Sequence, residues 1–230
     1  MSKTFLFAGA SSAIAKEAVK LLHAKGFKVI GISRKPVDSI YDEFYEIEKY
    51  DFGNFPSIDN SIDGLVYFPG TINLKPFHRI SASEFQNDFF INVYGAMAFM
   101  QAYLTNLKAV ESSSVVFISS VAADIGLPFH SSISASKSAI QGLTKALAAE
   151  YAPKIRVNCI APSLVKTPLA DKFINTPEKL EQMQIKNPLR KFGTSLDIAN
   201  AISFLLTAES NWITGQIIAV DGGMGTIKNS

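Results

Sequence analysis

The chain has 230 residues, of which 47% are hydrophobic and 18% are charged, and this composition excludes a disordered chain. Its formal net charge of +2 is too small to indicate nucleic acid or an anionic membrane as a partner. No apolar run approaches the ~20 residues that cross a bilayer, and the N-terminus shows no signal-peptide pattern, so we expect a cytoplasmic protein.

The first half of the chain alternates apolar runs typical of strands with patterns typical of helices. A turn at Gly9–Ser12 leads into a first helix, which is predicted to end at Gly26. The acidic and aromatic segment Ile40–Tyr50 predicts one short helical turn followed by a strand. The four strands expected here lie at Thr4–Ala8, Lys28–Ser33, the end of Ile40–Tyr50 and Gly64–Phe68.

The second half continues this alternation. Ser83–Lys108 is predicted to be helical with a break near Asn92, and Ser131–Tyr151 to be one long helix. Pro162–Phe192 is punctuated by prolines and has no strand pattern, and Ser195 is predicted to cap the last helix. The three strands expected here lie at Ser114–Ser119, Arg156–Ile160 and Gln216–Val220.

Strands that alternate with helices predict right-handed βαβ crossovers. The expected fold class is therefore α/β: a single doubly wound parallel sheet of the Rossmann type, with helices on both faces. No repeat, linker or break in composition divides residues 1–230, so we expect one domain. The single cysteine, Cys159, has no disulfide partner and is expected to be a small buried hydrophobe. The sequence indicates no metal site.

A glycine turn lies where the first strand becomes the first helix. In a Rossmann unit, the N–H groups of such a turn and the positive end of the helix dipole hold the pyrophosphate of a dinucleotide. Gly9, Ser11, Ser12 and Ile14 are the residues that we expect to line this site. A lone glycine turn could equally be a tight connection between a strand and a helix.

With this turn in place, the sequence resembles the short-chain dehydrogenase/reductase family over essentially its full length. The family's turn, Thr-Gly-x-x-x-Gly-x-Gly, falls on Ala8, Gly9, Ala13 and Ala15, so only the first glycine is kept. The methyl group of Ala13 narrows the approach to the diphosphate, at roughly 1–3 kcal/mol unless the loop shifts. The resemblance implies a single NAD(P)-binding Rossmann domain over residues 1–230, with a weakened cofactor affinity.

The end of the second strand selects between the two nicotinamide cofactors. An acidic residue there would accept hydrogen bonds from the ribose of NAD(H), but this chain has Ser33-Arg34-Lys35. A guanidinium beside a small hydroxyl suits a 2′-phosphate, at about 1.5–3 kcal/mol for a charge-assisted contact. The alternative is a solvated Arg-Lys pair at a strand end. We predict NADP(H), with NAD(H) disfavoured. The resemblance makes Asp51 the acid that contacts the adenine.

The resemblance also places a set of catalytic positions. The family's Asn-Asn-Ala-Gly falls on Tyr67–Gly70, where only Gly70 matches. Asn92 matches the asparagine that holds a water in a proton relay, and Ser120 matches the serine that polarises the substrate carbonyl. Lys137 matches the lysine that grips the nicotinamide ribose.

Two further features follow from the same resemblance. Thr167 matches the threonine near the nicotinamide amide, and Thr167–Phe192 would lie over the cleft. Apolar residues in this segment indicate either a lid or ordinary packing: Leu169, Phe173, Ile174, Met183 and Ile185. The small residues of Ser131–Tyr151 would allow close helix packing between subunits, as in a homodimer or homotetramer.

The family's tyrosine position, one helical turn before Lys137, holds Ile133, which can neither give nor take a proton. A positioned general acid contributes about 10²–10⁴-fold in rate. Three functions stay open: an impaired oxidoreductase with a non-standard donor such as His130, a catalytically silent NADP(H)-binding regulatory or partner protein, and a lyase or isomerase that uses Lys137. We predict the first, acting on a small-molecule carbonyl or alcohol substrate.

Overall fold

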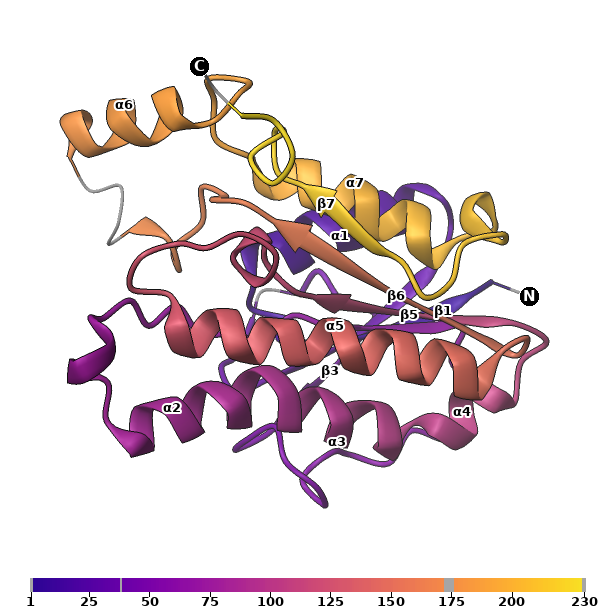
Figure 1. The fold of residues 1–230 in the computed structure, drawn as a ribbon. Helices are drawn as coiled ribbons and strands as arrows, with labels where there is room; N and C mark the ends of the chain where they lie inside the picture. Colours follow the sequence, from indigo (N-terminus) through magenta and orange to yellow (C-terminus); the bar gives the residue numbers. More distant parts are fainter. Residues whose placement is uncertain (1, 38, 172–175, 229–230) are drawn as a thin grey trace.

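A parallel sheet forms the centre of the computed structural model, which describes residues 2–37, 39–171 and 176–228. Within these residues the sheet has seven strands in the order β3-β2-β1-β4-β5-β6-β7 (Figure 1). Every neighbouring pair of strands is parallel. The strands are β1 Thr4–Ala8, β2 Lys28–Ser33, β3 Glu43–Glu46, β4 Gly64–Tyr67, β5 Ser113–Ile118, β6 Ile155–Pro162 and β7 Ile217–Val220.

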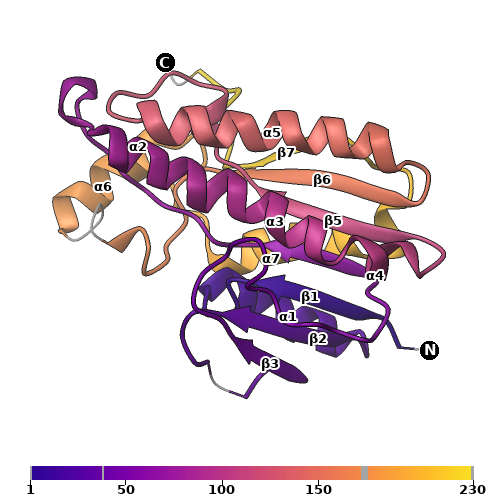
Figure 2. The same ribbon diagram turned by 90° about the horizontal axis from the view of Figure 1, so that it is seen from below.

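Helices cover both faces of this sheet (Figures 1 and 2). They are α1 Ala13–Ala24, α2 Ala82–Phe89, α3 Gly95–Ala102, α4 Leu104–Lys108, α5 Ser131–Tyr151, α6 Pro177–Lys186 and α7 Ser195–Leu206. One buried apolar cluster joins the sheet to α3 and α5, and a second joins it to α1 and α7. Since both faces are covered, β4 is buried along its whole length, and so are Phe5–Ala8 of β1. The predicted doubly wound α/β fold is confirmed, and Cys159 is buried in β6 as expected.

The strand order reverses beside β1. The chain passes from β1 to β2 and β3 on one side, and then returns to β4 on the other side. Ala8, the last residue of β1, pairs with Ile32 of β2 and with Tyr67 of β4. Because the carboxyl ends of these parallel strands share one edge, the segments that follow β1, β2 and β4 meet at the switch point.

The helical turn predicted within Ile40–Tyr50 is wrong. The segment instead bends into the edge strand β3, and tertiary contacts hold it extended. The Tyr41 hydroxyl donates to the Ala10 carbonyl at 2.7 Å, and the Asp42 carboxylate accepts from the Val29 N–H at 2.7 Å. Both partners lie far away in the sequence, so local propensity could not reveal them.

The cap predicted at Ser195 is also wrong, by one residue. Thr194 is the N-cap of α7: its hydroxyl accepts from the Asp197 N–H at 3.2 Å, and the Asp197 carboxylate accepts from the Thr194 N–H at 2.7 Å. This reciprocal capping box needs an acid at the third helical position, which Asp197 occupies only if the cap is Thr194.

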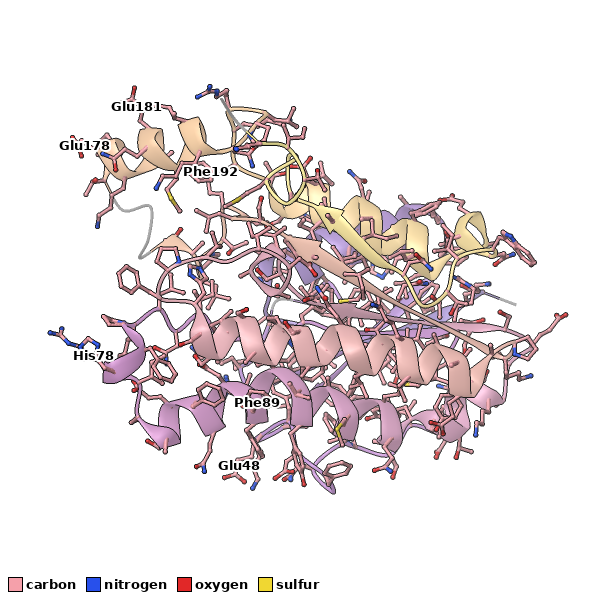
Figure 3. All side chains as sticks on the ribbon, viewed as in Figure 1. Glu48, His78, Phe89, Glu178, Glu181 and Phe192 are labelled. Atoms are coloured by element: carbon pink, nitrogen blue, oxygen red, sulfur yellow. The ribbon has the colours of Figure 1, made fainter. Side chains whose placement is uncertain are left out.

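The segment predicted to lie over the cleft contains α6, which begins with Pro177 at its first position after the Thr176 cap. Figure 3 shows Glu178 and Glu181 on the outer side of α6, which projects from the body of the molecule. Leu169 and Ile185 are about half exposed. Phe173 and Ile174 lie outside the described residues.

Candidate functional site

The glycine turn is packed directly against the segment that follows β4. Gly9 has a φ of +79°, and a Cβ built on it would lie 2.9 Å from Pro69 Cδ and 3.0 Å from Phe68 Cβ. Both the positive φ and this close approach require glycine. Ser12 occupies the N-cap position of α1 without a side-chain capping bond. The two segments therefore meet at the switch point, with the N-terminus of α1 beside them.

The end of β2 joins the same turn. The buried hydroxyl of Ser33 donates to the Ser11 hydroxyl at 3.1 Å. Arg34 follows on the surface, and its guanidinium carbon lies 5.7 Å from the ring centroid of Tyr50. Among the described residues, no carboxylate forms an ion pair with Arg34. Within the described residues, an exposed guanidinium without a paired carboxylate thus stands beside the glycine turn.

Tyr50 is a residue of this site that the sequence interpretation missed. Its ring is buried and packs edge-on against Tyr67, with centroids 5.9 Å apart. Burial raises the pKa of Tyr50, while hydrogen bonds with the Ser33 hydroxyl and with the backbone of Arg34 and Gly9 act in the opposite direction. The phenol therefore lies between the glycine turn and the end of β2. An aromatic residue directly before Asp51 was the available signal.

Asp51 lies shortly after β3 and is half-buried. Its carboxylate accepts from the Phe52 N–H at 2.7 Å and lies 3.3 Å from Lys49 Nζ. It shares no described contact with the glycine turn and adjoins it only through its neighbour Tyr50.

Gly70, Asn92 and Lys137 are brought together from three separate parts of the chain. A Cβ built on Gly70 would lie 3.2 Å from Asn92 Oδ1 and 3.3 Å from Lys137 Nζ. The predicted break near Asn92 is confirmed: it is a π-helical turn at Phe90–Tyr94, between α2 and α3. The wider turn carries the buried Asn92 side chain toward the loop after β4.

Lys137 lies on α5 and is buried, with 7% of its surface exposed. Its ammonium donates to the Ile118 carbonyl at 2.8 Å, at the end of β5. Burial lowers the pKa of Lys137 to about 8. Ile133, one turn earlier, is 4% exposed and contributes only apolar surface. The site therefore holds an amine whose pKa is lowered to about 8 by burial, beside a side chain that cannot exchange a proton.

The side chains of three other predicted residues form hydrogen bonds only with neighbouring residues of their own loops in the described structure. Ser120 follows β5, and its hydroxyl accepts from the Ala122 N–H at 3.2 Å. The Thr167 hydroxyl donates to the Val165 carbonyl at 3.4 Å. His130 is partly exposed, and its Nδ1 lies 2.7 Å from the Pro128 carbonyl oxygen. In the described structure, none of the three forms a hydrogen bond to Asn92 or Lys137.

A buried carboxylate beside this cluster was also missed. Asp88 lies one helical turn before Asn92, and hydroxyl groups from Thr71 and Ser132 donate to it at 2.6 Å each. Its partners lie 17 and 44 residues away in the sequence. The residue spacing therefore offered no signal for this contact.

Two other features are not found among the described residues. No described helix combines the length and the apolar character that a membrane crossing requires. In the described part of the chain, no three His, Cys, Asp or Glu side chains converge where they could hold a metal ion.

Comparisons with known proteins show which proteins the chain is similar to. A family model described as enoyl-(acyl carrier protein) reductase matches residues 55–225. The L-xylulose reductase of Bos taurus is 31% identical over 230 residues, which cover 95% of this chain and 94% of that protein. Carbonyl reductase (NADPH) 2 of Sus scrofa is 29% identical over 230 residues, which again cover 95% of this chain and 94% of that protein. A solved structure described as ElxO with NADP bound is 26% identical, covers 97% of this chain and 99% of that one, and has a TM-score of 0.85. The chain therefore belongs to the short-chain dehydrogenase/reductase family of oxidoreductases.

Proposed function

We propose that the protein is an NADP(H)-dependent oxidoreductase that interconverts a small-molecule carbonyl and its alcohol. The observation that carries this proposal is the convergence of Gly70, Asn92 and Lys137 beside the glycine turn. The exposed Arg34 at the end of β2 supports the phosphorylated cofactor. The names of the similar reductases, and NADP in the similar ElxO structure, support the same reaction class.

The residues present fit a dinucleotide. The cradle at Gly70, which a Cβ would fill, lies beside the ammonium of Lys137, and that ammonium would hold the nicotinamide ribose. Ser33 and Arg34 would hold the 2′-phosphate. NADPH, when bound, supplies the hydride. The other residues proposed to hold the cofactor are Gly9, Ser11, Ser12 and Ile14 at the pyrophosphate, Asp51 at the adenine and Thr167 at the nicotinamide amide.

The chain's own residues would handle the proton. The Ser120 hydroxyl would donate a hydrogen bond to the substrate oxygen, which gains negative charge as the hydride arrives. Ile133 has no proton to give. The Lys137 ammonium, whose pKa is lowered to about 8, would protonate the alkoxide, directly or through a water held by Asn92. We infer a non-standard donor and a reduced rate.

A catalytically silent NADP(H)-binding protein is the second candidate. Two observations favour it: the buried Ile133 contributes only apolar surface, and the ring of His130 is held by its own loop. In this case the cofactor would bind without hydride transfer, and the bound form would serve a regulatory or partner role.

Turnover of NADPH with a panel of small aldehydes and ketones separates the two candidates. We expect slow oxidation of NADPH matched by alcohol formation, and loss of this turnover in Lys137→Met. Lys145→Met, which changes an exposed lysine of the same helix, should keep the wild-type rate. Binding of NADPH without any turnover would select the silent protein, and absence of binding would exclude both.

We also propose that the protein assembles as a homodimer or homotetramer. The outer face of α2, the π-turn and α3 carries an apolar groove, and Tyr94 and Met97 on it are 43% and 40% exposed. On α5, a Cβ built on Gly142 would meet no atom within 4 Å, which leaves room for another helix. The groove is lined by Gln86, Phe89, Phe90, Val93, Tyr94 and Met97.

A further inference from the structure

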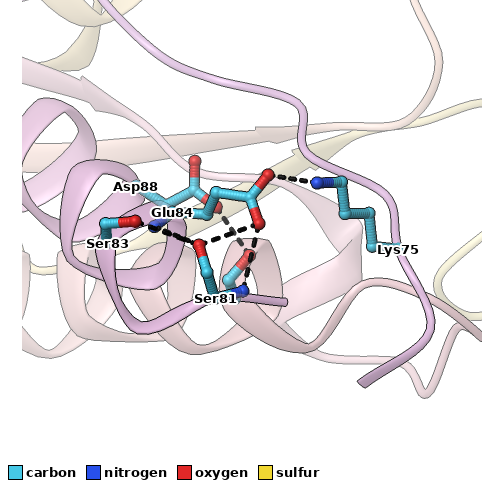
Figure 4. A network of polar contacts seen from close by, with 6 residues as sticks. Lys75, Ser81, Ser83, Glu84 and Asp88 are labelled. Carbon is cyan, nitrogen blue, oxygen red and sulfur yellow. Dashed lines mark hydrogen bonds and ion pairs between the residues drawn. The ribbon is translucent and has the colours of Figure 1, made fainter. Parts of the chain in front are cut away.

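Asp88 is a fully buried carboxylate that forms no ion pair with a lysine, arginine or histidine in the described part of the chain. Only 1% of its surface is exposed. Its two carboxylate oxygens accept from the hydroxyl groups of Thr71 and Ser132, at 2.6 Å each. Figure 4 shows Asp88 behind the cap of α2, where Lys75 pairs with Glu84 instead.

A carboxylate in this position is costly for stability. Removing a charge from water is unfavourable unless the charge is paired, and two hydrogen bonds to hydroxyl groups offset only part of the loss. Apolar side chains of similar volume commonly stabilise such a position better than a buried polar group does. Stability alone therefore does not account for an acid at this place.

The bonds of Asp88 lead directly to the cluster at Gly70. The Thr71 hydroxyl, which donates to Asp88, accepts from Asn92 Nδ2 at 2.9 Å. The Thr71 N–H donates to Asn92 Oδ1 at 3.3 Å, and Asn92 Nδ2 also donates to the Asp88 carbonyl at 2.8 Å. Asn92 Nδ2 also donates to the Ser136 hydroxyl of α5 at 3.3 Å. The orientation of the Asn92 amide is thus set by Thr71, by the turn that contains Asp88 and by Ser136.

The second carboxylate oxygen reaches the helix that carries the lysine. Ser132 lies in the first turn of α5, directly before Ile133 and five residues before Lys137. Asp88 therefore connects three segments that surround the site: the loop after β4, helix α2 and the start of α5. No other described carboxylate joins all three segments.

We propose that Asp88 is a positioning residue, which holds Asn92 Oδ1 and Lys137 Nζ facing each other across Gly70. The inference rests on the proposed reductase function, because Asn92 and Lys137 are the proton-handling groups of that site. Asp88 touches neither substrate nor cofactor. It would contribute by fixing the positions of Asn92 and Lys137, which are proposed to contact these ligands.

Asp88→Asn tests this role with little change in shape. The new amide NH₂ cannot accept a hydrogen bond, so either the Thr71 or the Ser132 hydroxyl loses the acceptor for its proton and must reorient. We expect kcat for carbonyl reduction to fall by about tenfold or more, because small displacements of positioning groups have effects of this size. The KM for the carbonyl and the NADPH dissociation constant should stay within about twofold, since Asp88 does not contact either ligand.

A second measurement does not depend on turnover. The carboxamide protons of Asn92 donate within this network, so we expect them to exchange with solvent about tenfold faster in Asp88→Asn, as followed by NMR. Asp124→Asn is the matched control, because Asp124 is exposed and accepts only from Gln141 at 2.9 Å. It should leave both readouts at wild-type values.

A third variant separates geometry from stability. The triple variant Thr71→Val, Asp88→Leu and Ser132→Ala removes the Asp88 carboxylate together with the two hydroxyl groups that donate to it. We expect the thermal midpoint to equal or exceed that of the wild type while kcat stays low. Restoration of wild-type kcat by this apolar triple variant would overturn the inference.

The outcomes distinguish this inference from the proposed function. If the wild type reduces no carbonyl, the reductase fails, while the Asn92 exchange rate still decides the role of Asp88. Unchanged Asn92 exchange in Asp88→Asn overturns the positioning role, whatever happens to the rate. Faster exchange with a selective loss of kcat supports both.

Discussion

At the scale of a single residue, the proposed choice of proton donor depends on Ile133, because its side chain carries no hydroxyl group. A phenol there would lie one helical turn from Lys137, whose charge would lower the phenol's pKa. We therefore predict that Ile133→Tyr raises the rate of carbonyl reduction by about tenfold or more, the order of a general-acid contribution.

The control for this prediction is Ile133→Phe, which adds the same ring without the hydroxyl. NADPH oxidation should rise in the tyrosine variant alone. An equal rise in both variants would show that ring packing changes the rate, and would contradict a role for the missing hydroxyl.

Arg34 is predicted to select the cofactor. Arg34→Ala should weaken NADPH binding by about tenfold or more, as expected for loss of a charge-assisted contact of about 1.5–3 kcal/mol, and should leave NADH binding unchanged. Fluorescence titration of both cofactors measures this, with Lys35→Ala as the neighbouring control. Equal affinity of the wild type for NADPH and NADH would contradict the prediction.

The buried amine of Lys137 predicts a pH dependence. Burial lowers its pKa to about 8, and the neutral amine cannot donate, so kcat for reduction should fall as pH rises through about 8. The unfolded chain keeps the ordinary, higher pKa and binds more protons between the two values. Stability should therefore rise with pH above about 8. Rate profiles and denaturation at several pH values test the two effects. A kcat that is constant through this range would exclude Lys137 as the donor.

At the scale of elements, the π-turn at Phe90–Tyr94 depends on a close contact with β4. A Cβ on Gly95 would collide with the Tyr67 hydroxyl, which donates to the Ile91 carbonyl at 2.8 Å. Gly95→Ala should destabilise the fold by about 1–3 kcal/mol through overpacking. Gly142→Ala on α5, where a Cβ meets nothing within 4 Å, should be neutral or stabilising by up to about 1 kcal/mol. Urea denaturation of both variants measures the difference, and equal stability would contradict this contact.

The same scale shows what the sequence could predict. Apolar patterns were enough to predict the central strands, because both faces of these strands are buried. They were also enough to predict α1, α5 and α7, because the buried face of each helix repeats with the helical period. The helical turn predicted before the edge strand β3 was wrong because Tyr41 and Asp42 are held by distant backbone groups. The break near Asn92 was predictable, but its π-helical form was not. The link between Asp88 and Ser132 spans 44 residues, and only the fold brings them together.

At the scale of the whole molecule, the apolar groove over α2 and α3 predicts self-association. A negative charge in it should be costly to bury between subunits. We expect the wild type to be a dimer or tetramer by light scattering and Met97→Glu to shift it toward the monomer. Lys108→Glu, placed on α4 outside the groove, is the control. A monomeric wild type would contradict the proposed assembly.

The close packing of Gly9 against Pro69 couples the two segments that are proposed to hold the two ends of the dinucleotide. A Cβ built on Gly9 would lie only 2.9 Å from Pro69 Cδ, so the glycine turn packs closely against the peptide that leads to Gly70. In the cofactor arrangement proposed above, a loop shift that made room for the diphosphate beside Ala13 would therefore also displace the segment at Gly70, beside the proposed nicotinamide position. Affinity at one end and alignment for hydride transfer at the other are expected to change together in this protein.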